Sequence, residues 1–143
     1  MSIVRLGKTI EADNEPQAQL ISVVDPDWAK WFDKLEAFTS QPKDWPPECG
    51  TFPSREVVGS ARVFLEVLRQ HARKPSRLSP SVVGGIGITF KCADRKVYVE
   101  FSNKGSVLAL FSDGVTDPQV EKISPDENGY SGLIARIKTY FHE

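Results

Sequence analysis

Apolar and polar residues alternate along the chain between Gly84 and Gly114, and the alternation breaks only at short turns. Apolar side chains at every second position are typical of a strand with one buried and one solvated face. Glycine, asparagine and aspartate in the interruptions favour hairpin turns. The pattern therefore predicts a three-stranded antiparallel meander, with strands at Ile86–Cys92, Lys96–Phe101 and Ser106–Phe111.

A helix with a broad aromatic face is predicted ahead of the meander. Asp25–Pro26–Asp27 supplies a capping carboxylate, a first-turn proline and a first-turn acid, so the helix is expected from Pro26 to Thr39. Its apolar residues recur at three- and four-residue spacing and are Trp28, Trp31, Phe32, Leu35 and Phe38. Such a face requires an apolar surface to cover.

Two further helices are predicted by the same spacing. Ser54 is the expected N-cap of a helix that ends near Ala72, before Lys74–Pro75. Its apolar stripe consists of Val57, Val58, Ala61, Phe64, Leu65 and Leu68. A last amphipathic helix is expected after Tyr130–Gly132.

The remaining segments are interpreted as connections and short strands. Residues 1–16 are polar and expected to be flexible, residues 18–24 form a strand or a helical turn, and residues 41–53 form a proline-rich loop. Pro75–Pro80 is expected to be a linker, and Gln119–Ser124 a fourth strand at the sheet edge. The fold class expected is α+β: one domain over residues 1–143, with an antiparallel sheet of three to five strands packed by two to three helices.

Composition and charge are those of a globular domain. The 143 residues suffice for one core, and 40% hydrophobic and 26% charged residues lie near the globular average. A net charge of −1 gives no overall attraction to nucleic acid or to an anionic membrane. No apolar run approaches the roughly 18 residues that span a bilayer, and Met1–Lys8 lacks the apolar stretch of a secretion signal. We therefore expect a cytoplasmic protein with no membrane partner.

The two cysteines, Cys49 and Cys92, are expected to be reduced thiols, because a cytoplasmic chain of this length needs no disulfide. Zinc sites use about four nitrogen, sulfur or oxygen ligands, usually in close pairs. Neither cysteine has a second cysteine or a histidine nearby in the sequence. No metal and no cofactor are therefore expected.

Residues able to catalyse a reaction are sparse. Histidine is the usual base beside a nucleophile, and the chain has only His71 and the penultimate His142. Asp113 and Asp117 flank a turn, where aspartate commonly bonds its own backbone. The glycines of Val83–Gly87 precede a strand rather than a helix, so they favour bulge geometry over phosphate binding. Enzymatic activity is left open, and a non-enzyme is favoured.

The strongest local charge feature is the group Arg69, Arg73, Lys74 and Arg77. The helix dipole favours cations at a helix C-terminus, so a solvated helix end is the first interpretation. Contact with a protein partner is the second and contact with nucleic acid the third, because the late loops are acidic and separated charges can steer a partner.

Trp45 is the other candidate for recognition, because it lies in the proline-rich loop. Its ring is expected to pack into its own domain, since aromatic burial is strongly stabilising. A ring that binds a partner is the alternative. The predicted partner-binding residues are thus Trp45, Arg69, Arg73, Lys74 and Arg77, with no catalytic and no metal-binding residue.

The order of several short motifs resembles a group of small bacterial proteins to which no activity is assigned. The motifs are Trp45 in a Gly/Pro loop, the Pro53–Ser54 helix start, the Gly84–Gly85 pair, and the strand Val97–Phe101 that turns at Gly105. In that group the loop reads Trp-Asp-Gly-Tyr-Gly-Ala, whereas Pro46–Gly50 stands here, and Phe90–Lys91 replaces a Glu-Trp pair. The resemblance covers residues 44–114. It implies a compact α+β fold in a bacterial, cytosolic setting and carries over no catalytic residue.

These observations favour a non-enzymatic accessory module that binds a protein partner, with a homodimer as one form of that partner. The scarcity of catalytic groups, the separated charges and a sheet edge able to accept a strand support this hypothesis. Small size and a bacterial setting suggest an antitoxin or an immunity-type inhibitor. A nucleic-acid-binding protein using the Arg69–Arg77 segment is the first alternative, and a small metal-dependent hydrolase using Asp113 or Asp117 is the second.

Overall fold

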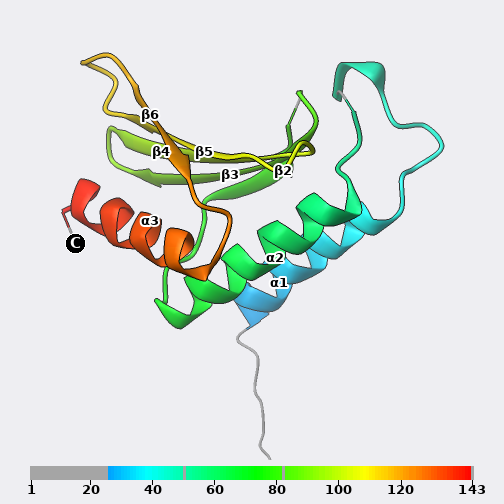
Figure 1. The fold of residues 1–143 in the computed structure, drawn as a ribbon, viewed down its shortest axis with the longest axis horizontal. Helices are drawn as coiled ribbons and strands as arrows, with labels where there is room; N and C mark the ends of the chain where they lie inside the picture. Colours follow the sequence, from blue (N-terminus) through cyan, green and yellow to red (C-terminus); the bar gives the residue numbers. More distant parts are fainter. Residues whose placement is uncertain (1–25, 50, 82, 143) are drawn as a thin grey trace, which may run out of the picture.

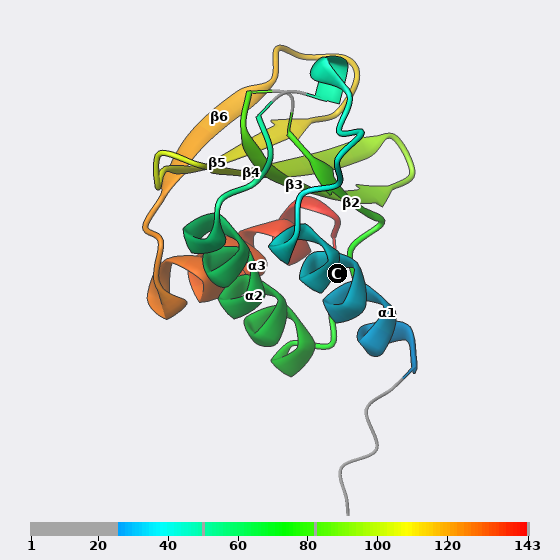
Figure 2. The ribbon, with the colours of Figure 1, turned by 90° about the vertical axis from the view of Figure 1, so that its right-hand side faces the viewer.

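The computed structural model describes residues 26–49, 51–81 and 83–142 and has an α+β fold. The described α-helices all lie on one side of a five-stranded antiparallel sheet (Figure 1, Figure 2). In chain order the elements are α1 (Pro26–Glu36), the 3-10 helices η1 (Ala37–Thr39) and η2 (Pro47–Cys49), α2 (Arg55–Gln70), β2 (Arg77–Pro80), β3 (Gly85–Cys92), β4 (Arg95–Ser102), β5 (Val107–Ser112), β6 (Gln119–Ile123) and α3 (Glu127–Tyr140). The strands cross the sheet in this same order.

The predicted meander is confirmed and forms β3, β4 and β5. Directly paired residues in an antiparallel sheet lie on the same face, so the register decides which side chains meet the helices. Ile88 pairs with Val99, and Val99 pairs with Ala109. The buried face of the sheet consists of Leu78, Ile86, Ile88, Phe90, Val97, Val99, Phe101, Val107, Ala109, Phe111 and Ile123.

The edges of the sheet differ from one another in how well the sequence predicts them. The expected fourth strand is present as β6, Gln119–Ile123. The interpretation of Pro75–Pro80 as a linker is wrong, because Arg77–Pro80 forms β2 and pairs with β3. Leu78 is fully buried opposite Ile88, which anchors the segment. Pro80 is tolerated because β2 has a strand on one side only.

Two helix ends depart from the predicted bounds. α1 ends at Glu36, and the predicted last turn is the 3-10 helix η1. α3 begins at Glu127 rather than after Gly132, because the side chain of Asp126 accepts a hydrogen bond from the amide of Gly129 at 2.8 Å and caps the helix. The predicted cap Asp25 and the predicted segments of residues 1–16 and 18–24 lie outside the described residues.

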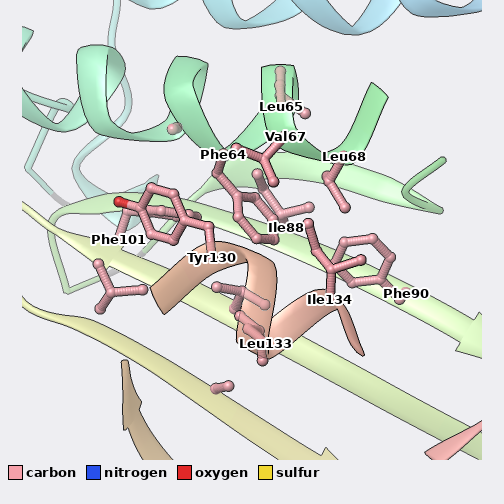
Figure 3. Packing of buried hydrophobic residues seen from close by; sticks show 14 of the residues in the cluster. Phe64, Leu65, Val67, Leu68, Ile88, Phe90, Phe101, Tyr130, Leu133 and Ile134 are labelled. Atoms are coloured by element: carbon pink, nitrogen blue, oxygen red, sulfur yellow. The ribbon is translucent and has the colours of Figure 1, made fainter. Parts of the chain in front are cut away.

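The second helix begins as predicted. Ser54 caps α2 by accepting a hydrogen bond from the amide of Val57 at 3.2 Å. The helix runs from Arg55 to Gln70, so its last residue lies close to the expected end. Its buried stripe faces both the sheet and α3 (Figure 3).

Asn103, in the turn between β4 and β5, fastens the start of α2 to the sheet. Its Oδ1 accepts a hydrogen bond from the amide of Ser54 at 2.8 Å, and its Nδ2 donates to the carbonyl of Phe52 at 3.0 Å. One side chain thereby bonds two backbone groups that flank Pro53. The proline-rich loop is held at one end of the sheet, away from its centre (Figure 1).

Gly85 is required by the backbone at the start of β3, and its replacement tests this geometry. Its φ is +135°, and a Cβ atom would lie 1.9 Å from the carbonyl oxygen of Phe101. Gly85→Ala should therefore lower the free energy of unfolding by roughly 2–5 kcal/mol. Urea unfolding followed by circular dichroism measures the change.

Gly59→Ala is the matched control, because a Cβ atom at Gly59 on α2 meets nothing within 4 Å. Alanine is the better helix former, so this variant should be stabilised by about 0.5–1 kcal/mol. Equal stability of the two alanine variants would contradict the close approach of β3 and β4 at Gly85.

Candidate functional site

The face of the sheet turned away from the helices is the candidate site, and we call it the open face. Its side chains come from the strand positions that alternate with the buried ones. One row across the five strands consists of Arg77, Thr89, Tyr98, Leu110 and Val120. The neighbouring row consists of Ser79, Gly87, Glu100, Leu108 and Lys122. The pair Lys91 and Lys96 lies one row beyond, at the turn between β3 and β4.

Tyr98 lies flat across the neighbouring strand at Gly87. A Cβ atom at Gly87 would lie 2.4 Å from the Tyr98 hydroxyl oxygen and 2.6 Å from a ring carbon. The missing side chain of Gly87 therefore provides the space in which the ring rests. The Tyr98 ring therefore lies near the centre of the sheet, at a position where the neighbouring residue Gly87 has no side chain.

A carboxylate and two hydroxyls meet beside this ring. The Tyr98 hydroxyl donates a hydrogen bond to Glu100 Oε1 at 3.3 Å, and the hydroxyl of Ser81 donates to the same oxygen at 3.2 Å. Ser81 is buried, with 3% of its surface exposed, whereas Tyr98 and Glu100 are half-buried. We call these residues the Ser81–Tyr98–Glu100 cluster.

The cluster is suited to accept a hydrogen bond rather than to transfer a proton. Burial raises the pKa of Tyr98, and the nearby negative charge of Glu100 raises it further. The phenol therefore keeps its proton at neutral pH and stays a donor to Glu100. Both hydroxyls bond the same carboxylate oxygen, Glu100 Oε1.

Apolar side chains are also exposed on this face. Val120 is 62% exposed and Leu108 is 38% exposed, while Leu110 is half-buried between them. Together with Tyr98 they form an apolar strip across β4, β5 and β6. An exposed apolar strip rimmed by polar residues is a common mark of a binding surface.

The predicted basic group at the end of α2 does not form a single surface. Arg69 forms an ion pair with Glu66 at 2.9 Å, and Lys74 forms one with Asp27 at 2.9 Å. The guanidinium of Arg73 lies over the ring of Phe141, 5.1 Å from its centre.

The Arg69–Glu66 pair lies within α2, while Lys74 and Arg73 tie the segment after α2 to Asp27 of α1 and to Phe141. Arg77 alone of the four lies on the open face, where it pairs with Thr89. The structure therefore separates a group that is continuous in the sequence.

Trp45 contacts its own loop. The ring is half-buried and packs edge-to-face on Phe52, with ring centres 4.9 Å apart. Phe52 in turn packs on Phe38 at 6.1 Å. This arrangement agrees with the first interpretation, a ring packed into its own domain, and its part in partner binding stays a prediction.

The groups considered for catalysis lie near helix ends and in the turn after β5. His71 and His142 are exposed near helix ends. Asp113 accepts hydrogen bonds from the amides of Val115 at 2.9 Å and Thr116 at 2.8 Å, as the turn interpretation predicts. These bonds lower the pKa of Asp113. Within the described residues, no group of three or more His, Cys, Asp or Glu side chains is placed to hold a metal ion.

A cleft of about 250 Å³ lies between β6 and α3, on the helix side of the sheet. Its lining residues are Phe111, Gln119, Glu121, Arg136, Thr139 and Tyr140. Arg136 and Glu121 form an ion pair at 2.8 Å, so the charges at this cleft already bond each other. Small-molecule sites usually occupy about 300–1,000 Å³, so this cleft is smaller than most. The open face is therefore the stronger candidate site.

Sequence reasoning did not select Tyr98, Glu100, Leu108 or Val120 as binding residues. Tyr98, Glu100 and Val120 are interpreted from the sequence only as parts of strands. The strand pattern predicts Leu108 and Leu110 in the core, and this is wrong, because Val107 and Ala109 are buried instead and Leu108 is 38% exposed. Leu108 and Leu110 are large apolar residues at positions that alternate with the buried Val107, Ala109 and Phe111. Apolar residues on both faces of a strand indicate that the second face is also used.

Comparison of the chain with protein families, with curated proteins and with solved structures finds no match. The resemblance to small bacterial proteins therefore stays a prediction. Among the described residues, no helix combines the length and the apolar character that crossing a bilayer requires.

The geometry of the cluster predicts how Tyr98 ionises. Its folded-state pKa is raised, so the stabilisation is fully present below the unfolded value of about 10 and is lost as pH rises through the folded value. Glu100→Gln should lower the pKa of Tyr98 toward the ordinary value, because it removes the nearby negative charge. Ultraviolet absorbance of the phenolate measures this, with Tyr98→Phe subtracted.

Tyr130 is the internal control for this titration. Burial raises its pKa as well, but its hydroxyl bonds Ser60 at 2.6 Å in the core and not Glu100. Glu100→Gln should therefore leave the Tyr130 titration in place. A Tyr98 titration that does not respond to Glu100→Gln would contradict the contact between the two side chains.

Proposed function

We propose that this chain is a non-enzymatic protein-binding module and that the open face is its binding surface. The observation that carries the proposal is that all described α-helices cover the same face of the sheet, as two views show (Figure 1, Figure 2). An antiparallel sheet with one solvated face normally places polar residues there. Here Tyr98, Leu108 and Val120 lie on that face instead, which favours contact with another macromolecule.

The size of the open face suggests the kind of complex. Four spacings between five strands span about 19 Å, and six residues along a strand span about 20 Å, so the face covers about 400 Å². A standard interface buries about 800 Å² on each partner. A partner would therefore contact the adjoining turns as well, or bind transiently.

Protein binding is favoured over the two alternatives by local contacts. Two of the cations proposed for nucleic acid, Arg69 and Lys74, already form ion pairs within the chain. The carboxylate of Asp113 accepts hydrogen bonds from its own turn, which competes with its use as a metal ligand. An antitoxin or an immunity-type inhibitor is the narrower form of our proposal, and it rests on small size and on the resemblance to bacterial proteins.

A matched pair of variants tests the proposal. Leu108 on the open face and Val63 on α2 are apolar and almost equally exposed, at 38% and 39%. Leu108→Glu should weaken capture of a stoichiometric protein partner from the native host at least about tenfold, because a charge would enter the apolar strip. Val63→Glu should not. Affinity capture with quantitative mass spectrometry compares the unmodified protein with the two variants.

The same variants address self-association. If the captured partner is a second copy of the chain, Leu108→Glu should convert the dimer to a monomer in sedimentation experiments, and Val63→Glu should not. A set of captured proteins that is identical for both variants, or no stoichiometric partner including the chain itself, would refute the proposal.

A further inference from the structure

We infer that the open face binds an acidic protein surface, a statement that rests on the proposed function and specifies the partner. The carrying observation is a frame of four basic side chains around the apolar strip. We call Arg77, Lys91, Lys96 and Lys122 the cationic frame. They come from β2, β3, β4 and β6 and all point to the open face.

The cationic frame carries more positive charge than the outward strand positions balance. None of its four members forms an ion pair with a described residue, in contrast to Arg62, Arg69 and Arg136 on the helices and to Lys74 after the end of α2. Among the described strands, Glu100 is the single acid at an outward position, and its carboxylate accepts hydrogen bonds from Ser81 and Tyr98. Asp94 and Asp113 lie in turns at the Lys96 end of the sheet. The outward strand positions therefore carry an excess of positive charge on a chain whose net charge is −1.

One pair within the frame is unfavourable in the free protein. Lys91 and Lys96 are directly paired across β3 and β4, next to the two-residue turn. Like charges at directly paired positions destabilise a sheet. An acidic partner would relieve this repulsion, which would make the free energy of binding more favourable.

A protein partner fits this face better than nucleic acid does. Single-stranded nucleic acid is held by aromatic side chains on which bases stack, together with a basic groove. The open face has one such ring, Tyr98, beside the aliphatic side chains of Leu108, Leu110 and Val120. Acidic residues around an apolar patch on a protein match both the frame and the strip.

The test uses two probes of similar charge, a deca-glutamate peptide and single-stranded deca-thymidylate. We expect the peptide to bind weakly at low salt and to shift the backbone amide signals of β3 and β4 in nuclear magnetic resonance spectra. Lys91→Glu combined with Lys96→Glu should weaken peptide binding at least about tenfold. The milder pair Lys91→Gln and Lys96→Gln should act in the same direction and tests the frame if the reversed pair does not fold.

Lys34→Glu combined with Lys43→Glu is the matched control, because both lysines are exposed and lie on α1 and in the proline-rich loop. It changes the net charge equally and should leave peptide binding within about twofold, since distant exposed charges are screened. Glu100→Gln should strengthen peptide binding, because it removes the one carboxylate on the outward strand positions.

Three results would overturn the inference. They are tighter binding of deca-thymidylate than of the peptide, equal effects of the two lysine pairs, and no binding of the peptide at low salt. The first would assign the face to nucleic acid. A further result would separate the two proposals. If Leu108→Glu abolishes binding of a native partner but Lys91→Glu/Lys96→Glu does not, the open face is still a protein-binding surface. Only the inference that the partner surface is acidic would then be refuted.

Discussion

The packing of Phe64 on both the sheet and α3 is the contact on which the structure depends most (Figure 3). Its fully buried ring lies 6.2 Å from Phe90, 5.3 Å from Phe101 and 5.3 Å from Tyr130, measured between ring centres. One side chain thus joins α2 to β3, β4 and α3. Fully burying a phenylalanine side chain stabilises a fold by roughly 1.5–3 kcal/mol. The helices are therefore fixed to a single face of the sheet.

This one-sided packing gives the two faces of the same strands different roles. Val97, Val99 and Phe101 of β4 are buried under the helices, while Tyr98 and Glu100 point the other way. The rigid core holds the backbone that positions these outward residues. Gly87 adds the one local feature that the open face requires, because its missing side chain lets the Tyr98 ring lie down. The candidate site is thus a consequence of the core and not a separate structure placed on it.

Much of the fold could be predicted because its signals are local. Alternation predicted β3, β4 and β5, and Ser54 predicted the start of α2. β2 was missed because four residues that end in a proline resemble a linker, and only the pairing of Leu78 with Ile88 gives them a strand conformation. The apolar spacing predicts a start of α3 that is too late, because the helix begins at the cap Asp126, ahead of its main apolar residues.

The candidate site was harder to predict, because it depends on register. In the structure the two-residue turn Ala93–Asp94 fixes the pairing of Lys91 with Lys96. The sequence pattern predicts a three-residue connection at Ala93–Arg95 and a strand that begins at Lys96, so it does not give this register. Lys122 joins the same face only through the pairing of β5 with β6, which follows a longer loop. Exposure of Leu108 and Val120 also required knowing that all described α-helices lie on the opposite side.

Two groups of basic residues show why the density of charge along a sequence is a poor guide to a binding surface. Arg69, Arg73 and Lys74 are close in sequence, and the fold gives Arg69 and Lys74 acidic partners and Arg73 an aromatic one. The cationic frame is spread over four strands, and its members acquire no acidic partner from the described residues. Arg77 belongs to the first group by sequence and to the second by position. A cation whose charge the fold leaves uncompensated, at a fixed position on a rigid sheet, is the one that a partner can use.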